Sequence, residues 1–277
     1  MKRIMIPVFL LAAAVHLSAA TVTEYTVPSA AMNKEIHVNV ILPDAYAEGG
    51  NFPVLYLYHG AGGNHQAWPY GMPECLREAD RFQMIMVCPD AELSWYLDSP
   101  VRPEIRYETF CAEELVAWTD AHFRTVRDRL ARGTCGLSMG GHGALWIAIR
   151  HRETFGSATA LSAGVDFRPF PGHWGLDDLL GNIEEYPENW DACVVVNAAR
   201  DLKDGELAIS IDCGSEDFFY QVNADLHNLL TEQGVKHDYA IRPGSHTGEY
   251  WNNAIVYAAA FAEKQFRLAN PETGTEK

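Results

Sequence analysis

Short apolar runs alternate along most of this chain with longer stretches whose apolar residues recur at helical spacing. Such alternation predicts an α/β fold, in which helices cover both faces of a mostly parallel sheet. We predict helices at 107–123, 221–232 and 251–266, and another that begins just after residue 138. We predict strands, the first two as an antiparallel pair, at 23–27, 36–42, 53–58, 83–88, 134–137, 158–161, 207–213 and 238–241.

The stretch 165–204 interrupts this rhythm. It contains Pro169, Pro171 and Gly172, shows no clean period, and is too long for an ordinary connection. Ligands enter sheets of this kind at the carboxyl ends of the strands. We therefore predict an insertion that lies over these ends and shapes substrate choice. Residues 21–277 otherwise form a single predicted domain, since no repeat, low-complexity tract or linker divides their sequence.

The first twenty residues have the layout of a secretory signal. Lys2 and Arg3 provide a positive start, residues 4–17 are mostly apolar, and small residues precede a cleavage point at Ala20. The apolar stretch is short for a membrane span. We predict cleavage after Ala20, or within a residue or two of it, and a secreted or periplasmic protein without stable membrane insertion.

The formal net charge of −16 argues against nucleic acid as a partner, because phosphate binding needs basic patches. Six cysteines would permit disulfides in an exported protein. However, Cys88, Cys135 and Cys213 end apolar, strand-like runs, where a thiol serves as a small apolar side chain. Pairing among the other three stays open. No C-x-x-C pair or Cys/His cluster in the sequence has zinc-ligand spacing, so we predict no metal.

Residues 136–140 read Gly-Leu-Ser-Met-Gly, between a predicted strand and a predicted helix. In this setting a G-x-S-x-G run is typical of a nucleophile elbow, a sharp turn that exposes a reactive serine. Gly136 and Gly140 would supply the room that such a strained turn needs. The alternative is a glycine-rich turn before a core helix. We predict that Ser138 is the nucleophile of an acyl-transfer site.

A serine hydroxyl needs a base, usually a histidine that a carboxylate orients. After an elbow of this type the chain order is serine, then carboxylate, then histidine. Asp217 is our first candidate for the carboxylate, because it follows the strand at 207–213 through a short turn. Asp212 and Glu216 are its competitors. The alternative role for Asp217 is to cap the helix that follows.

His246 is the candidate base, because it lies between the last predicted strand and the last predicted helix. His227 falls within a predicted helix and His237 at the far end of a strand, so both are poorer candidates. His59 and His142 also lie near the expected site. We expect each of them to hold its loop or helix in place, since the chain order already assigns the base.

An acyl-transfer site also needs hydrogen-bond donors for the oxyanion. One should be the backbone N–H of Met139, directly after the nucleophile. The second should come from a glycine-rich loop after an early strand, and His-Gly-Ala-Gly-Gly at 59–63 is such a loop. Ala61 N–H is our first choice and Gly62 N–H the second. We also expect Gly62 to contact the substrate.

Taken together, these motifs resemble the esterase D-like group of serine esterases. This group includes S-formylglutathione hydrolases, tributyrin esterases, acetylxylan and feruloyl esterases, and mycolyltransferases. The matching pieces run in the expected order over nearly the whole chain after residue 20: VPSAAM at 27–32, HGAGGN at 59–64 with Trp68, SWYLDSP at 94–100, GLSMGGHGA at 136–144, CGSEDF at 213–218, and GSH at 244–246 followed by Trp251.

The resemblance implies an α/β-hydrolase fold, a triad of Ser138, Asp217 and His246, and oxyanion donors at Ala61 and Met139. It further suggests that Trp68, Trp95 and Trp251 lie at the side of the pocket. A role in the core is an equal alternative for each of them. The stretch 165–204 matches no subgroup that we can align, so the resemblance does not specify a substrate.

The sequence thus supports the hypothesis of a secreted serine carboxylic-ester hydrolase that forms an acyl-enzyme and needs no cofactor. Export fits esters on plant polysaccharides better than S-formylglutathione, which is cytosolic, so we expect acetyl or feruloyl esters as substrates. A generalist short-chain esterase of the tributyrin type and an acyltransferase to a sugar are alternatives. A carbohydrate-binding protein on a hydrolase fold is a non-enzymatic alternative, although it would not need an intact triad. The oligomeric state stays open.

Overall fold

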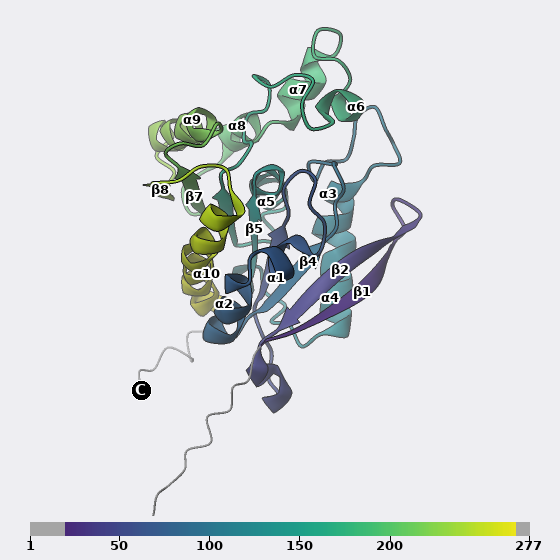
Figure 1. Ribbon diagram of the computed structural model, residues 1–277, viewed down its shortest axis with the longest axis vertical. Coiled ribbons are helices and arrows are strands. Elements are labelled where there is room, and N and C mark those ends of the chain that lie inside the picture. The colour runs from purple at the N-terminus through teal and green to yellow at the C-terminus, as the bar shows by residue number, and fades with distance from the viewer. Residues whose placement is uncertain (1–19, 270–277) are drawn as a thin grey trace, which may run out of the picture.

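The computed structural model describes residues 20–269, which form one sheet with helices packed on both faces (Figure 1). The predicted signal segment lies outside these residues except for Ala20, so its cleavage stays a prediction. Among the helices of the described part, none is both long and apolar enough to cross a membrane.

The sheet has the strand order β1-β2-β4-β3-β5-β6-β7-β8. β2 pairs antiparallel with both β1 and β4, whereas all other neighbours pair parallel. This topology confirms the antiparallel opening pair and the mostly parallel sheet. The strands are β1 (Thr21–Ser29), β2 (Lys34–Leu42), β3 (Val54–Tyr58), β4 (Ile85–Pro89), β5 (Arg132–Leu137), β6 (Ser157–Leu161), β7 (Ala208–Gly214) and β8 (Asp238–Arg242).

Three of the predicted helices are confirmed as α5 (Met139–Arg150), α9 (Tyr220–Glu232) and α10 (Gly248–Ala269). The helix predicted at 107–123 is instead divided into α3 (Tyr107–Thr109), a π-helical turn (Phe110–Glu114) and α4 (Leu115–His122). The first turn is held by a side chain outside the helix, because Thr109 N–H and Oγ1 both donate to the Asp98 carboxylate. The wider π turn begins directly after Thr109. The other helices are α1 (Ala67–Gly71), α2 (Glu74–Phe82), α3 (Tyr107–Thr109), the π turn (Phe110–Glu114), α4 (Leu115–His122), α6 (Leu176–Leu180), α7 (Pro187–Cys193), α8 (Val195–Ala198), and 3₁₀ turns at Asp44–Glu48, Arg129–Ala131 and Ala199–Asp201.

The central strands are buried on both sides. In β3, Val54, Tyr56 and Tyr58 belong to the core that includes α4, α5 and α9, whereas Leu55 and Leu57 belong to the core beneath α2 and α10. Successive side chains of a strand point to opposite faces, and here both faces are covered by helices. This explains why the sequence of β3 is continuously apolar rather than alternating.

The stretch 165–204 is a packed unit that contains α6, α7 and α8 and contributes Phe167 and Trp190 to the main core. Figure 1 shows α6 and α7 together at one end of the molecule. His142, in the first turns of α5, lies 2.9 Å from the Cys193 carbonyl oxygen. Since α5 begins at the carboxyl end of β5, the insertion does lie over the strand ends, whereas its effect on substrate choice stays a prediction.

All six cysteines lie within the described residues, and each is a buried free thiol. Burial raises the pKa of Cys75, Cys193 and Cys213 to about 12. These thiols therefore stay protonated near neutral pH. The burial of free thiols at Cys88, Cys135 and Cys213 agrees with the packing role expected of these three residues.

Candidate active site

Ser138 occupies the sharp turn between β5 and α5. Its backbone has φ 55° and ψ −119°, a conformation that costs a residue other than glycine on the order of 1–3 kcal/mol. A Cβ at Gly136 would lie 2.0 Å from the carbonyl oxygen of Gly140, and one at Gly140 would lie 2.2 Å from that of Tyr58. Only glycine fits at either place, and the turn therefore presents the serine hydroxyl at the carboxyl end of β5.

The structure brings Ser138, His246 and Asp217 into one hydrogen-bonded chain. Ser138 Oγ lies 2.9 Å from His246 Nε2, and His246 Nδ1 lies 2.8 Å from Asp217 Oδ2. A carboxylate can only accept, so the proton of the imidazole belongs on Nδ1. Nε2 then keeps a free electron pair that faces the serine hydroxyl. This is the arrangement in which a histidine can remove the hydroxyl proton.

The contacts of Asp217 separate it from the other acidic candidates. Phe219 N–H donates to Asp217 Oδ1 over 2.8 Å, which leaves Oδ2 to face His246. By contrast, Asp212 binds Tyr250 and Arg242 instead of His246. Asp217 is fully buried at its side chain, so its charge has no competing contact with water.

His246 reaches the serine from the loop between β8 and α10. Gly244 in this loop has φ 140°, and a Cβ there would lie 2.6 Å from the ring of Tyr250. The loop can therefore fold back over β7 only with glycine at this position. His227 and His237 do not approach the serine, because they bind each other across 2.8 Å between α9 and the segment before β8.

The glycine-rich loop after β3 packs directly against the elbow. A Cβ at Gly60 would lie 3.2 Å from Ser138 Cβ. Within the described residues, the N–H groups of Ala61 and Met139 donate no hydrogen bond, and Met139 begins α5, where a helix has no internal acceptor for its first amides. Both amides are thus free to bind an oxyanion, and this role stays a prediction.

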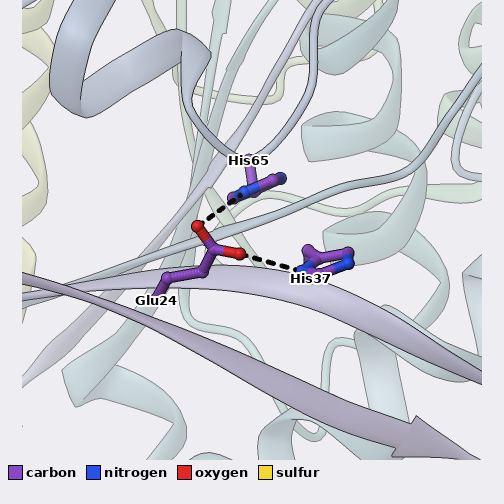
Figure 2. A group of neighbouring side chains, drawn as sticks. All are labelled: Glu24, His37 and His65. Carbon is purple, nitrogen blue, oxygen red and sulfur yellow. Dashed lines mark hydrogen bonds and ion pairs between the residues drawn. The ribbon is translucent and has the colours of Figure 1, made fainter.

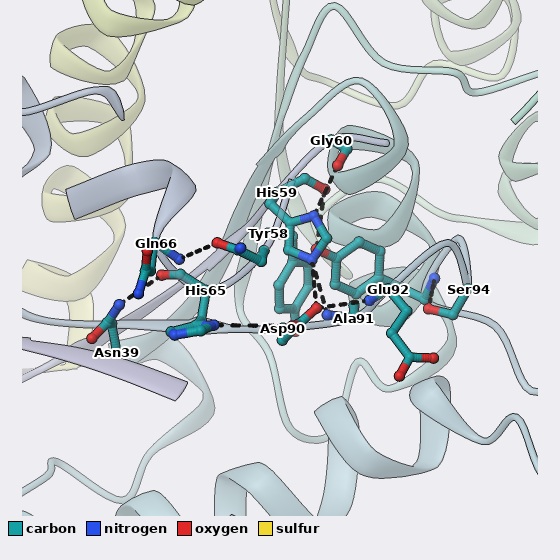
Figure 3. Close-up of polar contacts among 12 residues, drawn as sticks. Asn39, Tyr58, His59, Gly60, His65, Gln66, Asp90, Ala91, Glu92 and Ser94 are labelled. Carbon is teal, nitrogen blue, oxygen red and sulfur yellow. Dashed lines mark hydrogen bonds and ion pairs between the residues drawn. The ribbon is translucent and has the colours of Figure 1, made fainter. Parts of the chain in front are cut away.

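His59 supports this loop and does not act as a free base (Figure 3). Its Nδ1 lies 2.8 Å from the Gly60 carbonyl oxygen, and its Nε2 accepts from Ala91 N–H over 2.9 Å. Both ring nitrogens are therefore engaged with backbone groups. The imidazole is buried and links the loop after β3 to the loop after β4, which is the supporting role expected of it.

His142 likewise holds neighbouring segments together. Its Nδ1 lies 3.0 Å from the Trp95 carbonyl oxygen and its Nε2 lies 2.9 Å from that of Cys193. Burial lowers the pKa of His142 to about 4, so the ring is neutral near pH 7 and donates to one of these carbonyls at a time. The residue links α5 to the insertion and has the supporting role expected of it.

The three tryptophans predicted at the pocket are placed differently. Trp68 and Trp95 are buried, and their indole N–H groups donate to the carbonyls of Tyr58 and Trp174. These backbone acceptors let both rings fit wholly inside the core, so this structure corrects the expectation of a pocket-side position for them. Trp251 is only partly buried, and its ring meets His246 edge-on at 4.8 Å between centroids. Substrate contact stays a prediction for Trp251.

An aromatic surface that the sequence motifs did not predict lies beside His246. The ring of Phe218 lies 4.3 Å from that of His246, is 51% exposed, and stacks on Trp174 with 5.8 Å between centroids. Phe170 packs against Trp174 from within the insertion. One sequence signal was present, namely an aromatic pair directly after the predicted carboxylate Asp217. The insertion therefore reaches the site through its aromatic side chains.

A cavity of about 390 Å³ lies beside Gly62, between the glycine-rich loop and α6. Its size is typical of a site for a small molecule. Glu92, Arg102 and Asp178 give it a charged lining, in contrast to the aromatic surface around His246. The expectation that Gly62 contacts the substrate is compatible with this cavity and stays a prediction.

Comparison with known proteins agrees with this geometry. A family model described as "Putative esterase" matches residues 29–262. An acetyl esterase of Caldicellulosiruptor saccharolyticus is 28% identical over 232 residues, which cover 77% of this chain and 84% of the relative. An endo-1,4-beta-xylanase/feruloyl esterase of Xylanibacter ruminicola is 27% identical over 162 residues, which cover 54% of this chain and 22% of that protein. A solved ferulic acid esterase is similar with a TM-score of 0.78 and 26% identity, covering 89% of this chain and 98% of its own.

The family match runs from the end of β1 into α10 and so includes Ser138, Asp217 and His246. The similarity to the solved esterase, together with the eight-stranded sheet, confirms the expected α/β-hydrolase fold. The chain belongs to this esterase family, and it is an enzyme that hydrolyses carboxylic esters.

Proposed function

We propose that this esterase is a serine hydrolase whose catalytic triad is Ser138, His246 and Asp217. The observation that carries the proposal is the chain of contacts from Asp217 Oδ2 through His246 to Ser138 Oγ, with distances of 2.8 and 2.9 Å. Ser138 is buried to 8% exposure and His246 is partly exposed, so a substrate can reach the site from the side of the histidine.

In the proposed reaction, Ser138 Oγ attacks the ester carbonyl carbon while His246 Nε2 takes the hydroxyl proton. The backbone N–H groups of Ala61 and Met139 stabilise the oxyanion. The bond to the alcohol oxygen then breaks as His246 gives its proton to that oxygen, which leaves an acyl-enzyme. Water attacks the acyl carbon after giving a proton to His246, and the acid departs as Ser138 regains its proton. Asp217 orients His246 throughout and stabilises its charged form.

We propose acetyl or feruloyl esters of plant polysaccharides as the substrates. The proposal is supported by the names of the relatives, an acetyl esterase and a feruloyl esterase among them. The exposed ring of Phe218, with the partly buried Trp174 stacked on it, supports the proposal independently, because a feruloyl group or a sugar ring can stack on such a surface. The cavity beside Gly62 offers room for a further part of the substrate.

Secretion or export to the periplasm is part of this proposal. It is supported by the basic start, apolar stretch and small residues that precede Thr21. Secretion is tested by measuring the mass of the protein recovered outside the cytoplasm. A mature chain that begins at or near Thr21 is the expected result, and full-length protein retained in the cytoplasm would contradict it.

The variant Ser138→Ala tests the proposed nucleophile. Without the hydroxyl no acyl-enzyme forms, so we expect hydrolysis of p-nitrophenyl acetate to fall by at least about 10⁴-fold. Circular dichroism and the thermal midpoint should stay close to those of the parent protein. Turnover that persists in the folded variant would refute the assignment. A separate assay of the parent enzyme measures both the free acid released and the acyl-sugar formed. The ratio of these two products distinguishes hydrolysis from acyl transfer.

A further inference from the structure

Three side chains with metal-ligating atoms, none of them part of the proposed triad, meet beside β1 and β2 (Figure 2). Glu24 lies on β1, His37 on β2, and His65 in the loop between β3 and α1. The register pairs Glu24 with Asn39, and His37 with Thr26, so Glu24 and His37 are diagonal neighbours on one face of the hairpin. Spacing along the sequence predicted no metal, because it cannot reveal a group that strand register assembles.

The spacing of these atoms suits a small cation with nitrogen and oxygen ligands. His37 Nδ1 lies 2.9 Å from Glu24 Oε1, and His65 Nε2 lies 3.4 Å from Glu24 Oε2. The ligating atoms of all three residues lie within 4.8 Å of one another. Zn²⁺ bonds of roughly 2.0–2.1 Å in a tetrahedron place ligand atoms roughly 3.3 Å apart. Small side-chain movements would therefore bring all three onto one ion.

His65 gives a second and independent indication of a ligand. Its side chain is only 9% exposed, yet within the described residues neither ring nitrogen makes a well-formed hydrogen bond, and the carboxylate oxygens that face them lie 3.4 and 3.9 Å away. A buried imidazole without a well-formed hydrogen bond lowers the stability of the folded protein by about 1–3 kcal/mol. Such a group in a folded structure needs an explanation. A metal bound at Nε2, the nitrogen that faces Glu24, would satisfy it.

The surroundings of His65 also resemble those of a metal ligand. Asp90 Oδ2 lies 3.9 Å from His65 Nδ1, on the side of the ring away from Glu24. Ligating histidines usually direct their second nitrogen to such a carboxylate, which fixes the ring. Asn39 Nδ2 donates to the His65 carbonyl oxygen over 3.0 Å, so the backbone is held on the hairpin as well (Figure 3).

We propose that Glu24, His37 and His65 bind one Zn²⁺ ion, with water as a fourth ligand. Two imidazoles and one carboxylate favour Zn²⁺ and its late first-row neighbours over Ca²⁺ and Mg²⁺, which prefer oxygen ligands. The ion anchors the β1–β2 hairpin to the loop at 59–66. Asp90 extends this anchor, since it also lies 3.5 Å from Nε2 of His59, which supports the glycine-rich loop.

Titration calorimetry tests the proposal on the full mature chain after treatment with EDTA. We expect one Zn²⁺ per chain and a thermal midpoint that rises when ZnCl₂ is added. His37→Ala and Glu24→Gln each change an exposed residue and should keep the fold, yet each should weaken Zn²⁺ binding by at least about 100-fold. His122→Ala, which removes an exposed histidine on α4, is the matched control and should bind as the parent does.

CaCl₂ in place of ZnCl₂ should give neither saturable heat nor a higher thermal midpoint. The proposal would be overturned by the absence of saturable Zn²⁺ binding to the parent chain. It would equally be overturned by Zn²⁺ binding that both His37→Ala and Glu24→Gln leave unchanged. In either case the three residues are only a group of neighbouring polar side chains that binds no metal. The experiment measures Zn²⁺ binding and the thermal midpoint of unfolding. Its result therefore does not depend on the proposed serine chemistry.

Discussion

The residues around His246 divide into those that hold it and those that face solvent beside it. Phe219 N–H fixes one oxygen of Asp217 and so directs the other to His246. Phe218, the preceding residue, instead leaves half of its ring exposed next to the imidazole. Exposed aromatic surface beside a reactive group is suited to contact with a ligand. Adjacent positions in one turn thus serve different purposes.

Phe218→Ala tests this division at the level of a single side chain. Ring stacking contributes about 0.5–1.5 kcal/mol, so we expect kcat/KM for a feruloyl ester to fall by roughly two- to tenfold. The value for an acetyl ester, which has no ring to stack, should change much less. Steady-state rates with acetyl, butyryl and feruloyl esters, and with acetylated xylan, measure the contrast.

Tyr257→Ala is the matched control, because it removes an exposed ring that stacks on Arg242 from α10. It should leave all of these rates unchanged. An equal loss for every ester in Phe218→Ala would mean that the ring positions His246 and does not recognise the acyl group. Rates that are high for all short acyl chains would favour a generalist esterase.

At the scale of elements, a buried carboxylate fastens α3 to the carboxyl-terminal end of α5. Glu108 accepts hydrogen bonds from Trp146 over 2.8 Å, Arg150 over 2.7 Å and His151 over 3.0 Å. Burial by itself would raise the pKa of Glu108, but hydrogen bonds from His151, Arg150 and Trp146 lower it to about 2. Since α5 starts at Ser138, this contact fixes the far end of the helix that carries the elbow.

A lowered pKa in the folded state stabilises the protein above the unfolded value, near 4.5, and this contribution disappears as the pH falls toward 2. Glu108→Gln should therefore lower the free energy of unfolding at pH 7 by about 3 kcal/mol. The difference from the parent should shrink between pH 5 and pH 2. Urea unfolding at several pH values measures it.

Glu113→Gln, an exposed change in the adjoining π turn, is the control and should behave as the parent does at every pH. A stability difference between Glu108→Gln and the parent that is the same at pH 7 and pH 3 would contradict the assigned role. Such a constant difference in stability would come from the shape of the glutamine side chain and not from the lost charge.

For the molecule as a whole, features encoded by local sequence were predictable. The strand at 53–58 is a continuous apolar run, and the G-x-S-x-G turn sits between a strand and a helix. From the elbow onward, chain order together with positions in loops after strands selected Asp217 and His246, and the structure places His246 within hydrogen-bond distance of both Asp217 and Ser138.

The features that escaped prediction depend on contacts between distant segments. Trp68 and Trp95 are buried because carbonyls 10 and 79 residues away accept their indole N–H groups. The Glu24–His37–His65 cluster depends on the register of β1 with β2 and on the path of a later loop. Likewise, Trp174 meets Phe218 only because the insertion folds back over the sheet. No pattern within one segment carries this information.

The proposed reaction depends on Ser138 as the activated nucleophile of this esterase. Labelling with an alkyl fluorophosphonate tests this role of Ser138, because such a reagent transfers its phosphonyl group to an activated serine with loss of fluoride. We predict one phosphonyl group per chain, found by peptide mass analysis on the segment that contains Ser138, with esterase activity lost in step with labelling. Modification of a different residue, or full activity in a chain labelled at Ser138, would contradict the account.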